Sequence, residues 1–286
     1  MTVLDGFCIM IEKLSLKMEN VMFIKDFTEQ DIKIFENSTE NELFRAREPE
    51  PGYFMAESPN VIERALNDGY IPEMALVDES VANSSLVQRL FEEYKTPVYL
   101  ASPEHIKNVQ GFEMTRGALC LMNRRACKSA EDVLRGVSRI AILEDVMNPT
   151  NLGAIFRSAA SLGIEAIILT KGCSDPLYRR AARVSMGTVF QIPWARTEDV
   201  VSLLSHLKKS GFVSIAMALD ERAVKLGDSC LEGHEKMAFV LGSEGYGLKQ
   251  ETIEACDFTV MIPMTNGVDS LNVAAASAVV FWEFFR

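Results

Sequence analysis

The second half of the chain alternates short apolar runs with helical patterns, and this alternation constrains the fold more than any other feature. Runs such as "RIAIL", "AIILT" and "MAFVL" contain few polar residues. Such runs are typical of strands that are buried on both faces of a sheet. Because helical segments separate them, the pattern predicts an α/β domain over residues 139–286, with a parallel sheet that helices cover on both faces.

A smaller α/β unit is predicted to precede this domain at residues 46–123, where four extended patterns surround two helical ones. Residues 1–45 are acidic and have helical spacing, so we expect a helical extension there. Residues 124–138 are polar and basic and form the predicted linker. Within the larger domain, residues 176–186 indicate a helix, and residues 188–194 indicate a short strand.

The chain is acidic, with a net charge of −11. Residues 1–138 hold 15 Lys and Arg against 23 Asp and Glu, whereas residues 139–286 hold 14 against 17. A polyanionic partner usually requires a basic surface. Arg179, Arg180 and Arg183, however, lie close together with no acidic residue between them. The acidity therefore weakens a nucleic-acid function without excluding it.

The cysteines and histidines indicate no metal site. Six cysteines are scattered without a C-x-x-C pair, and the chain has three histidines, which favours reduced thiols in a cytoplasmic protein. The most apolar stretch, Val273 to Phe285, is too short for a membrane span and contains Glu283. Asp5 lies where an export signal would be basic. We therefore expect a cytoplasmic protein with no metal and no membrane segment.

Three strand exits in the larger domain carry unusual loops, and such exits are where parallel sheets bind ligands. The first contains Asn148-Pro149, then Asn151 and Gly153, with Arg157 on the helix that follows. Arg157 lies six residues after Asn151, and we expect this spacing to let the two side chains face one pocket. The alternative is an N-capped helix with a surface arginine.

The second loop is rich in glycine. Gly242, Gly245 and Gly247 follow a strand and have Glu244 among them, an arrangement that allows backbone amides to cradle a ligand. The spacing matches neither the dinucleotide G-x-G-x-x-G nor a P-loop, which argues against a nucleotide-dependent dehydrogenase. A plain tight turn is the alternative.

The third loop leads into the last helix and contains Asn266, Gly267, Ser270 and Asn272. Ser270 alone indicates a helix N-cap. We place Asn272 just inside the helix, where asparagine is a poor residue, so a function in the loop is the other interpretation.

Together, in this order and spacing, the three loops resemble the three signature motifs of the SpoU-type RNA ribose 2′-O-methyltransferases of the SPOUT superfamily. One departure is Asn266, at a position where that family usually has glycine. The N-terminal unit resembles, more loosely, the ribosomal-protein-L30e-like substrate-binding domain. The matching residues of the larger domain are Asn151, Gly153, Arg157, Asp175, Pro176, Arg183, Ser185, Met186, Gly187, Gly242, Glu244, Gly247, Leu248, Ile262, Pro263, Met264, Ser270, Leu271, Asn272 and Val273.

The resemblance implies a deep C-terminal trefoil knot, a homodimer formed through the knotted domain, and S-adenosylmethionine as the cofactor. It implies methyl transfer to a ribose 2′-hydroxyl of rRNA or tRNA. The catalytic candidates are Asn151, Arg157, Glu244, Ser270 and Asn272. The cofactor-binding candidates are Leu241, Gly242, Glu244, Gly247, Ile262, Met264, Leu271 and Asn272. The candidate RNA contacts are Arg116, Arg157, Arg179, Arg180 and Arg183.

Arg157 matches an arginine that is often proposed to activate the hydroxyl, but a guanidinium is a poor base. We therefore expect Arg157 to hold an RNA phosphate and the hydroxyl oxygen. The alternative function is a non-catalytic RNA-binding or ribosome-assembly factor that keeps the knotted fold, and Asn266 is the feature that favours it.

Overall fold

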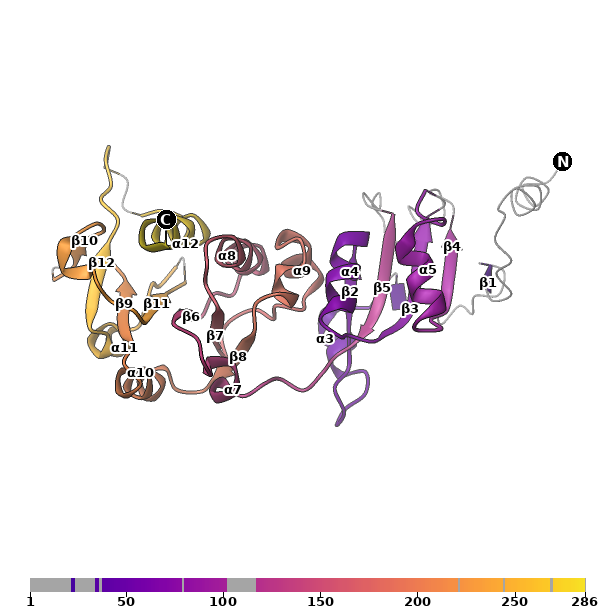
Figure 1. Ribbon diagram of the computed structural model, residues 1–286, viewed down its shortest axis with the longest axis horizontal. Coiled ribbons are helices and arrows are strands. Elements are labelled where there is room, and N and C mark those ends of the chain that lie inside the picture. The colour runs from indigo at the N-terminus through magenta and orange to yellow at the C-terminus, as the bar shows by residue number, and fades with distance from the viewer. Residues whose placement is uncertain are drawn as a thin grey trace.

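The computed structural model describes residues 22–23, 34–35, 38–78, 80–101, 117–220, 222–243, 245–267 and 270–285. Its two sheets lie side by side along the longest axis of the molecule (Figure 1). Arg116, Glu244 and most of the predicted extension at residues 1–45 lie outside the described residues.

The N-terminal sheet is mixed and has five strands in the order β1-β4-β3-β5-β2. Strands β1, β4 and β3 are parallel, whereas β5 is antiparallel to both β3 and β2. The helices α4 and α5 bury apolar side chains against it, among them Ile62 and Leu90. The elements of this unit are β1 (Met22–Phe23), α3 (Glu40–Arg45), β2 (Tyr53–Glu57), α4 (Pro59–Asn67), β3 (Pro72–Asp78), α5 (Ser85–Glu92), β4 (Val98–Ala101) and β5 (Ala118–Asn123).

The C-terminal sheet has seven parallel strands in the order β10-β12-β9-β11-β6-β7-β8, which confirms the predicted parallel-sheet α/β domain. Its elements are α7 (Ala130–Leu134), β6 (Arg139–Leu143), α8 (Pro149–Ser161), β7 (Ala166–Thr170), α9 (Arg179–Val184), η2 (Thr188–Phe190), β8 (Trp194–Thr197), α10 (Val200–Lys209), β9 (Val213–Met217), β10 (Val224–Lys225), η3 (Ser229–Leu231), β11 (Met237–Leu241), α11 (Gln250–Ala255), β12 (Phe258–Met261) and α12 (Val273–Phe285).

Helices cover both faces of this sheet (Figure 1). Successive side chains of a strand point to opposite faces, so Ile140 of β6 packs with α10 while Ala141 packs on the side of α8 and α12. Strands β6, β7 and β11 are almost fully buried, which explains their apolar sequences. The trefoil knot and the L30e-like identity of the first unit stay predictions.

The strand predicted at residues 188–194 is wrong. Residues Thr188–Phe190 form the short 3₁₀ helix η2, and the strand β8 begins only at Trp194. A tertiary contact explains the difference. Phe190 is buried between Phe54 and Tyr70 of the other unit, and its ring centroid lies 5.7 and 5.3 Å from theirs. The apolar run is therefore buried at a domain boundary and not in the sheet.

Ion pairs hold the two units together. Glu57, at the end of β2, is 2% exposed and accepts hydrogen bonds from Arg179 Nε at 2.7 Å and Arg183 Nη1 at 3.3 Å. Glu40 accepts the backbone N–H of Arg179 at 2.7 Å, and burial raises the pKa of this carboxyl. We call the contact of Glu57 with Arg179 and Arg183 the domain joint.

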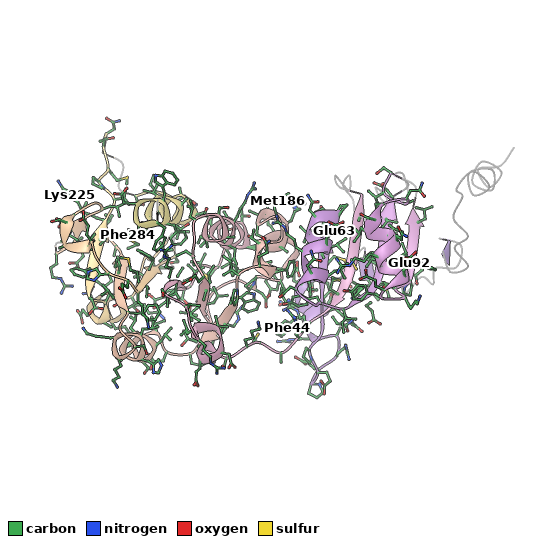
Figure 2. All side chains as sticks on the ribbon, viewed as in Figure 1. Phe44, Glu63, Glu92, Met186, Lys225 and Phe284 are labelled. Atoms are coloured by element: carbon green, nitrogen blue, oxygen red, sulfur yellow. The ribbon has the colours of Figure 1, made fainter. Side chains whose placement is uncertain are left out.

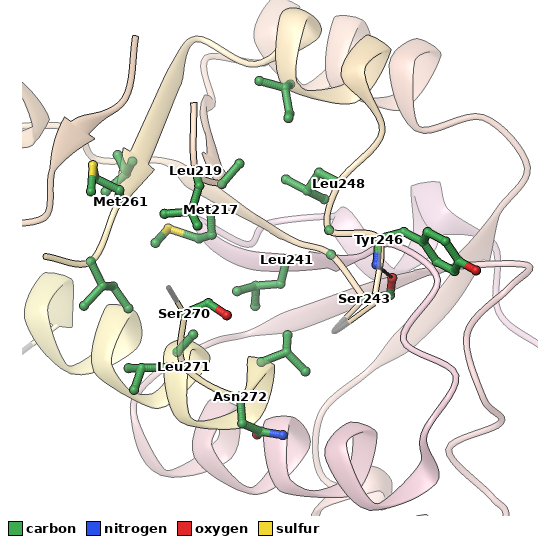
Figure 3. A pocket seen from close by; sticks show the side chains of 18 of the residues that line it. Met217, Leu219, Leu241, Ser243, Tyr246, Leu248, Met261, Ser270, Leu271 and Asn272 are labelled. Atoms are coloured by element: carbon green, nitrogen blue, oxygen red, sulfur yellow. Dashed lines mark hydrogen bonds between the residues drawn. The ribbon is translucent and has the colours of Figure 1, made fainter. Parts of the chain in front are cut away.

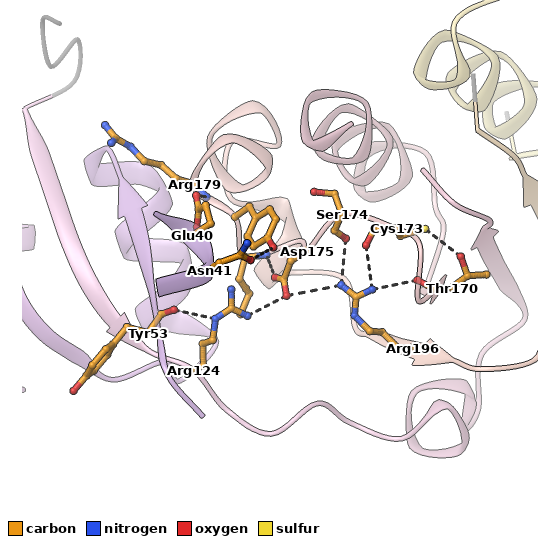
Figure 4. A network of polar contacts seen from close by, with 12 residues as sticks. Glu40, Asn41, Tyr53, Arg124, Thr170, Cys173, Ser174, Asp175, Arg179 and Arg196 are labelled. Atoms are coloured by element: carbon orange, nitrogen blue, oxygen red, sulfur yellow. Dashed lines mark hydrogen bonds and ion pairs between the residues drawn. The ribbon is translucent and has the colours of Figure 1, made fainter. Parts of the chain in front are cut away.

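The predicted linker is partly fixed in place beside the domain joint. Arg124 donates to the backbone oxygen of Tyr53 at 2.9 Å and to the carboxylate of Asp175 at 3.1 Å, and Asp175 lies between Arg124 and Arg196 (Figure 4). Further along, residues Ala130–Leu134 form α7. Only part of the segment is therefore an extended connection.

A turn of the larger unit also packs against α4. Arg64 Nη1 donates to the carbonyl oxygen of Met186 at 2.8 Å, and Met186 lies across the boundary from the helix that carries Glu63 (Figure 2). A Cβ at Gly187 would lie 3.0 Å from Cδ of Arg64, and Gly187 has φ +84°. Glycine is required here because the backbone is left-handed and α4 of the N-terminal unit lies against it.

We predict that Glu57→Ala destabilises the protein by about 2 kcal/mol, since it leaves Arg179 and Arg183 without their shared carboxylate in a partly buried site. Urea unfolding followed by tryptophan fluorescence measures the change. The matched control is Glu63→Ala on α4, which removes a carboxylate with no ion pair among the described residues and should cost less than about 0.5 kcal/mol. Equal effects of the two variants would contradict the prediction.

Candidate functional site

A cavity of about 470 Å³ opens at the carboxyl ends of β9, β11 and β12 (Figure 3). This is the edge at which parallel α/β sheets bind ligands. Its wall is mostly apolar, with backbone contributed by two loops. The lining residues are Met217, Ala218, Leu219, Leu241, Gly242, Ser243, Tyr246, Gly247, Leu248, Ile253, Val260, Met261, Ile262, Met264, Ser270, Leu271, Asn272, Val273 and Ala276.

The structure brings most of the predicted site residues to this one cavity. Every predicted cofactor-binding residue that the structure describes lines it, as does Ser270 of the predicted catalytic set. Glu244 lies outside the described residues. That these residues bind a cofactor stays a prediction. The lining members of the predicted set are Leu241, Gly242, Gly247, Ile262, Met264, Leu271 and Asn272.

The glycine loop folds tightly back on itself and forms one wall of the cavity. A Cβ at Gly242 would lie 2.5 Å from both the carbonyl oxygen of Gly247 and the nitrogen of Leu248, so no larger residue fits. The N–H of Gly247 donates to the carbonyl oxygen of Ser243 at 3.0 Å, and Gly247 has φ +67°. The loop is thus a tight turn and a cavity wall at once.

A buried carboxylate anchors this loop, and the sequence analysis missed it. Glu144 follows β6, is 2% exposed, and accepts the N–H of Lys249 at 2.9 Å and the hydroxyl of Thr252 at 2.8 Å. The carboxylate of Asp145 lies 3.4 Å from Nζ of Lys249. Its negative charge, and to a smaller extent that of Glu144, raises the pKa of Lys249. The available signal was the acidic pair Glu144-Asp145 directly after an apolar strand.

Asn272 is the N-cap of the last helix, which corrects its predicted place inside the helix. Helix α12 begins at Val273, the side-chain oxygen of Asn272 accepts the N–H of Ala274 at 2.9 Å, and its carbonyl oxygen accepts the N–H of Ala276 at 2.9 Å. Asparagine is among the best residues for this position. The interpretation of Ser270 as the N-cap is therefore wrong, and Ser270 is exposed in the cavity wall.

Asn272 also connects the third loop to the first. Its side-chain nitrogen donates to Oδ1 of Asn151 at 3.2 Å, and Asn151 is buried on α8. Two predicted catalytic residues that are far apart in the sequence are therefore in direct contact at the cavity.

Asn266, the departure from the family motif, has a left-handed backbone. Asn266 has φ +57° and Gly267 has φ +69°. Asparagine adopts this left-handed conformation more readily than other residues with a Cβ. Asn266 therefore has a backbone conformation that glycine also adopts readily.

Arg157 lies apart from the cavity. Asn151 is buried while Arg157 is exposed, because six residues of helix leave two side chains about 120° apart. The expectation that they face one pocket is wrong. Arg157 instead shares a face of α8 with Gly153, where a Cβ would lie 2.5 Å from the carbonyl oxygen of Ala181 in α9. Arg157 therefore lies near the close contact of α8 with α9, and its side chain makes no hydrogen bond or ion pair with the described residues.

The predicted RNA contacts divide into two groups. Arg179 and Arg183 belong to the domain joint, a role that the sequence did not suggest. Arg157 and Arg180 are exposed, and Arg116 lies outside the described residues. Binding of RNA by any of them stays a prediction.

One face of α12 exposes apolar side chains. Trp282 is 56% exposed and Val279 is 39% exposed, and they lie three residues apart, with exposed Ala275 one turn before them. The opposite face of this helix buries Ser277, Val280 and Phe281. Exposed apolar patches of this kind commonly mark interaction surfaces.

The described residues contain no group of three or more His, Cys, Asp or Glu arranged to hold a metal ion. Among these residues, none of the helices has the length and apolar character needed to cross a membrane.

Known proteins share this sequence and architecture. A Mycobacterium bovis protein named as an uncharacterized tRNA/rRNA methyltransferase is 40% identical over 233 residues, which cover 81% of this chain and 80% of that protein. An AdoMet-bound rRNA methyltransferase from Sinorhizobium meliloti has the same fold, with a TM-score of 0.74 at 22% identity over 92% of this chain and 97% of that one. An RNA 2′-O ribose methyltransferase gives a TM-score of 0.65 at 24% identity over 88% and 92% of the two chains.

Residues 138–282 match the SpoU rRNA Methylase family. This range contains the cavity, the domain-joint arginines and all three motif loops. With the match to the mycobacterial relative over four-fifths of each chain, it shows that this chain belongs to the SpoU methyltransferase family.

Proposed function

We propose that this protein transfers the methyl group of S-adenosylmethionine to a ribose 2′-hydroxyl of rRNA or tRNA. The observation that carries the proposal is the meeting of the glycine loop and the Ser270–Asn272 loop at one cavity, with Asn151 bonded to its rim. The names of similar proteins, which include tRNA/rRNA methyltransferases and an RNA 2′-O ribose methyltransferase, support the reaction.

The cavity fits a cofactor of this size and chemistry. Its volume of about 470 Å³ lies within the usual range for small-molecule sites. Leu241, Ile262 and Leu271 offer apolar surface to a purine ring. Gly242 lets the loop close on itself at the cavity wall, and a Cβ at Gly247 would meet nothing within 4 Å, so space is left beside the backbone there. When bound, the cofactor supplies an activated methyl group together with its leaving group.

The residues of the chain then have to orient the ribose and the phosphate. Asn272 is fixed by its cap and by Asn151, so its amide is held in one orientation at the cavity rim. Ser270 offers a hydroxyl in the same wall. Arg157 is exposed and has no ion pair with the described residues, which suits a guanidinium that holds an RNA phosphate outside the cavity. Positioning of this kind can supply much of the rate enhancement.

A non-catalytic RNA-binding factor is the competing function. Its sequence support was Asn266, but that residue adopts a left-handed backbone that glycine also favours. No other described residue of the site favours loss of activity.

We predict that deleting the gene removes a 2′-O-methyl group from cellular rRNA or tRNA. Comparison of 2′-O-methyl maps of all cellular RNA from strains with and without the gene measures this. Calorimetry with S-adenosylmethionine is the companion measurement on the purified protein. An unchanged map together with no cofactor binding would remove the enzyme assignment.

Arg157→Ala is expected to lower the rate of methyl transfer by about 100-fold or more, because the variant loses the guanidinium that holds the RNA phosphate. Cofactor affinity should stay nearly unchanged, since Arg157 does not line the cavity. Single-turnover methyl transfer and calorimetry separate the two effects. Lys209→Ala is the matched control, an exposed cation at the end of α10 on the opposite face of the sheet. A loss of cofactor binding in Arg157→Ala would contradict the proposal that Arg157 binds an RNA phosphate.

We also propose a homodimer that covers the α12 face formed by Ala275, Val279 and Trp282. Exposed tryptophan is a frequent anchor of protein interfaces, and this face lies on the helix that follows the third motif loop.

Trp282→Glu is therefore predicted to weaken self-association at least about tenfold, because it places a charge in an apolar interface. Sedimentation equilibrium measures the dissociation constant. Ile71→Glu is the control, since Ile71 is 61% exposed on the other unit and should leave association unchanged. A wild-type protein that stays monomeric at high concentration would defeat the dimer.

A further inference from the structure

Tyr246 is the most exposed large apolar or aromatic residue that the structure describes. Its exposed fraction is 92%, and its hydroxyl makes no hydrogen bond with the described residues. The residue nevertheless lines the mouth of the cavity. In Figure 3 its ring projects from the glycine loop on the side away from Ser270. Folding of the chain therefore gains no burial from this aromatic ring.

The turn that carries Tyr246 is held firmly at its base. The backbone N–H of Tyr246 donates to Oγ of Ser243 at 3.3 Å, and Gly247 closes the turn through its bond to Ser243. Just after the turn, Leu248 is buried, and Lys249 is bonded through its N–H to buried Glu144. Because the backbone of the turn is held, binding of a partner has to order only the two side-chain torsions of the ring.

The surroundings of the ring suit a flat, uncharged partner. A Cβ at Gly245 or at Gly247 would meet nothing within 4 Å, so both neighbours of Tyr246 leave open space. The nearest cation in the sequence, Lys249, lies 3.4 Å from Asp145 and 3.9 Å from Glu144, which largely neutralises it. The loop therefore offers a π surface and little free positive charge for a phosphate.

We propose that Tyr246 stacks on an unpaired nucleobase of the substrate strand at the cavity mouth. This inference rests on the proposed function, in which a ribose has to enter the cavity and its strand therefore passes this turn. A ribose in a regular duplex is hard to reach, so the substrate is single-stranded or splayed open at this point. Stacking on an aromatic ring tolerates any base because every base has a π face.

The test uses the full-length protein and two short single-stranded oligoribonucleotides. One carries 2-aminopurine at one position, and the other is identical except for an abasic site at that position. Wild type should bind the base-bearing strand about tenfold more tightly. Tyr246→Phe should keep this preference because the ring remains. Tyr246→Leu and Tyr246→Ala should lose it, although leucine remains apolar.

Three results would overturn the proposal. One is equal binding of the two probes by wild type, and another is a loss in Tyr246→Phe as large as in Tyr246→Ala. The third is a weaker affinity for S-adenosylmethionine in Tyr246→Ala, which would place the ring against the cofactor. The probe comparison needs no turnover, so it can fail while methyl transfer to cellular RNA proceeds, and the reverse outcome is equally visible.

Discussion

The buried carboxylate of Glu144 is the interaction on which the site depends. It follows the interior strand β6 and accepts hydrogen bonds from the N–H of Lys249 and the hydroxyl of Thr252, which come directly after the glycine loop. An unpaired carboxylate at this depth would be costly, whereas a bonded one fixes its partners. The first and second motif loops are thereby held in one geometry, and the contact of Asn272 with Asn151 adds the third. The cavity wall is therefore set by polar contacts between loops that lie far apart in the sequence.

The domain joint extends this rigidity to the N-terminal unit. Glu57 forms ion pairs with two arginines of α9. At the same boundary, the rings of Phe54, Tyr70 and Phe190 are in mutual contact. The interface combines apolar packing with buried ion pairs, unlike the weak polar contacts that permit domain motion. The two units therefore present a surface whose shape is largely fixed before a partner binds.

Local patterns in the sequence predicted the strands and helices that are buried by their own sheet. Apolar runs such as Ile140–Leu143 are typical of parallel strands that are buried on both faces. The errors occur where tertiary contacts decide. Phe190 is buried by another unit and not by a strand neighbour. Asn272 is the N-cap of α12, although serine, the residue at position 270, is as favourable a cap as asparagine. Glu57 and Glu144 were missed for the same reason, since their partners lie about 100 or more residues away.

These contacts also bear on how an acidic chain can approach RNA. Arg179 and Arg183 use part of their charge on Glu57, so the described surface near α8 and α9 leaves Arg157 and Arg180 as cations without an ion pair. Few free cations mean few released counterions, and the electrostatic share of the binding energy is correspondingly small. Recognition would then have to rely on fixed shape and on stacking, which do not require a basic surface. A rigid joint and an exposed ring beside the cavity are the two features that this mode of recognition needs.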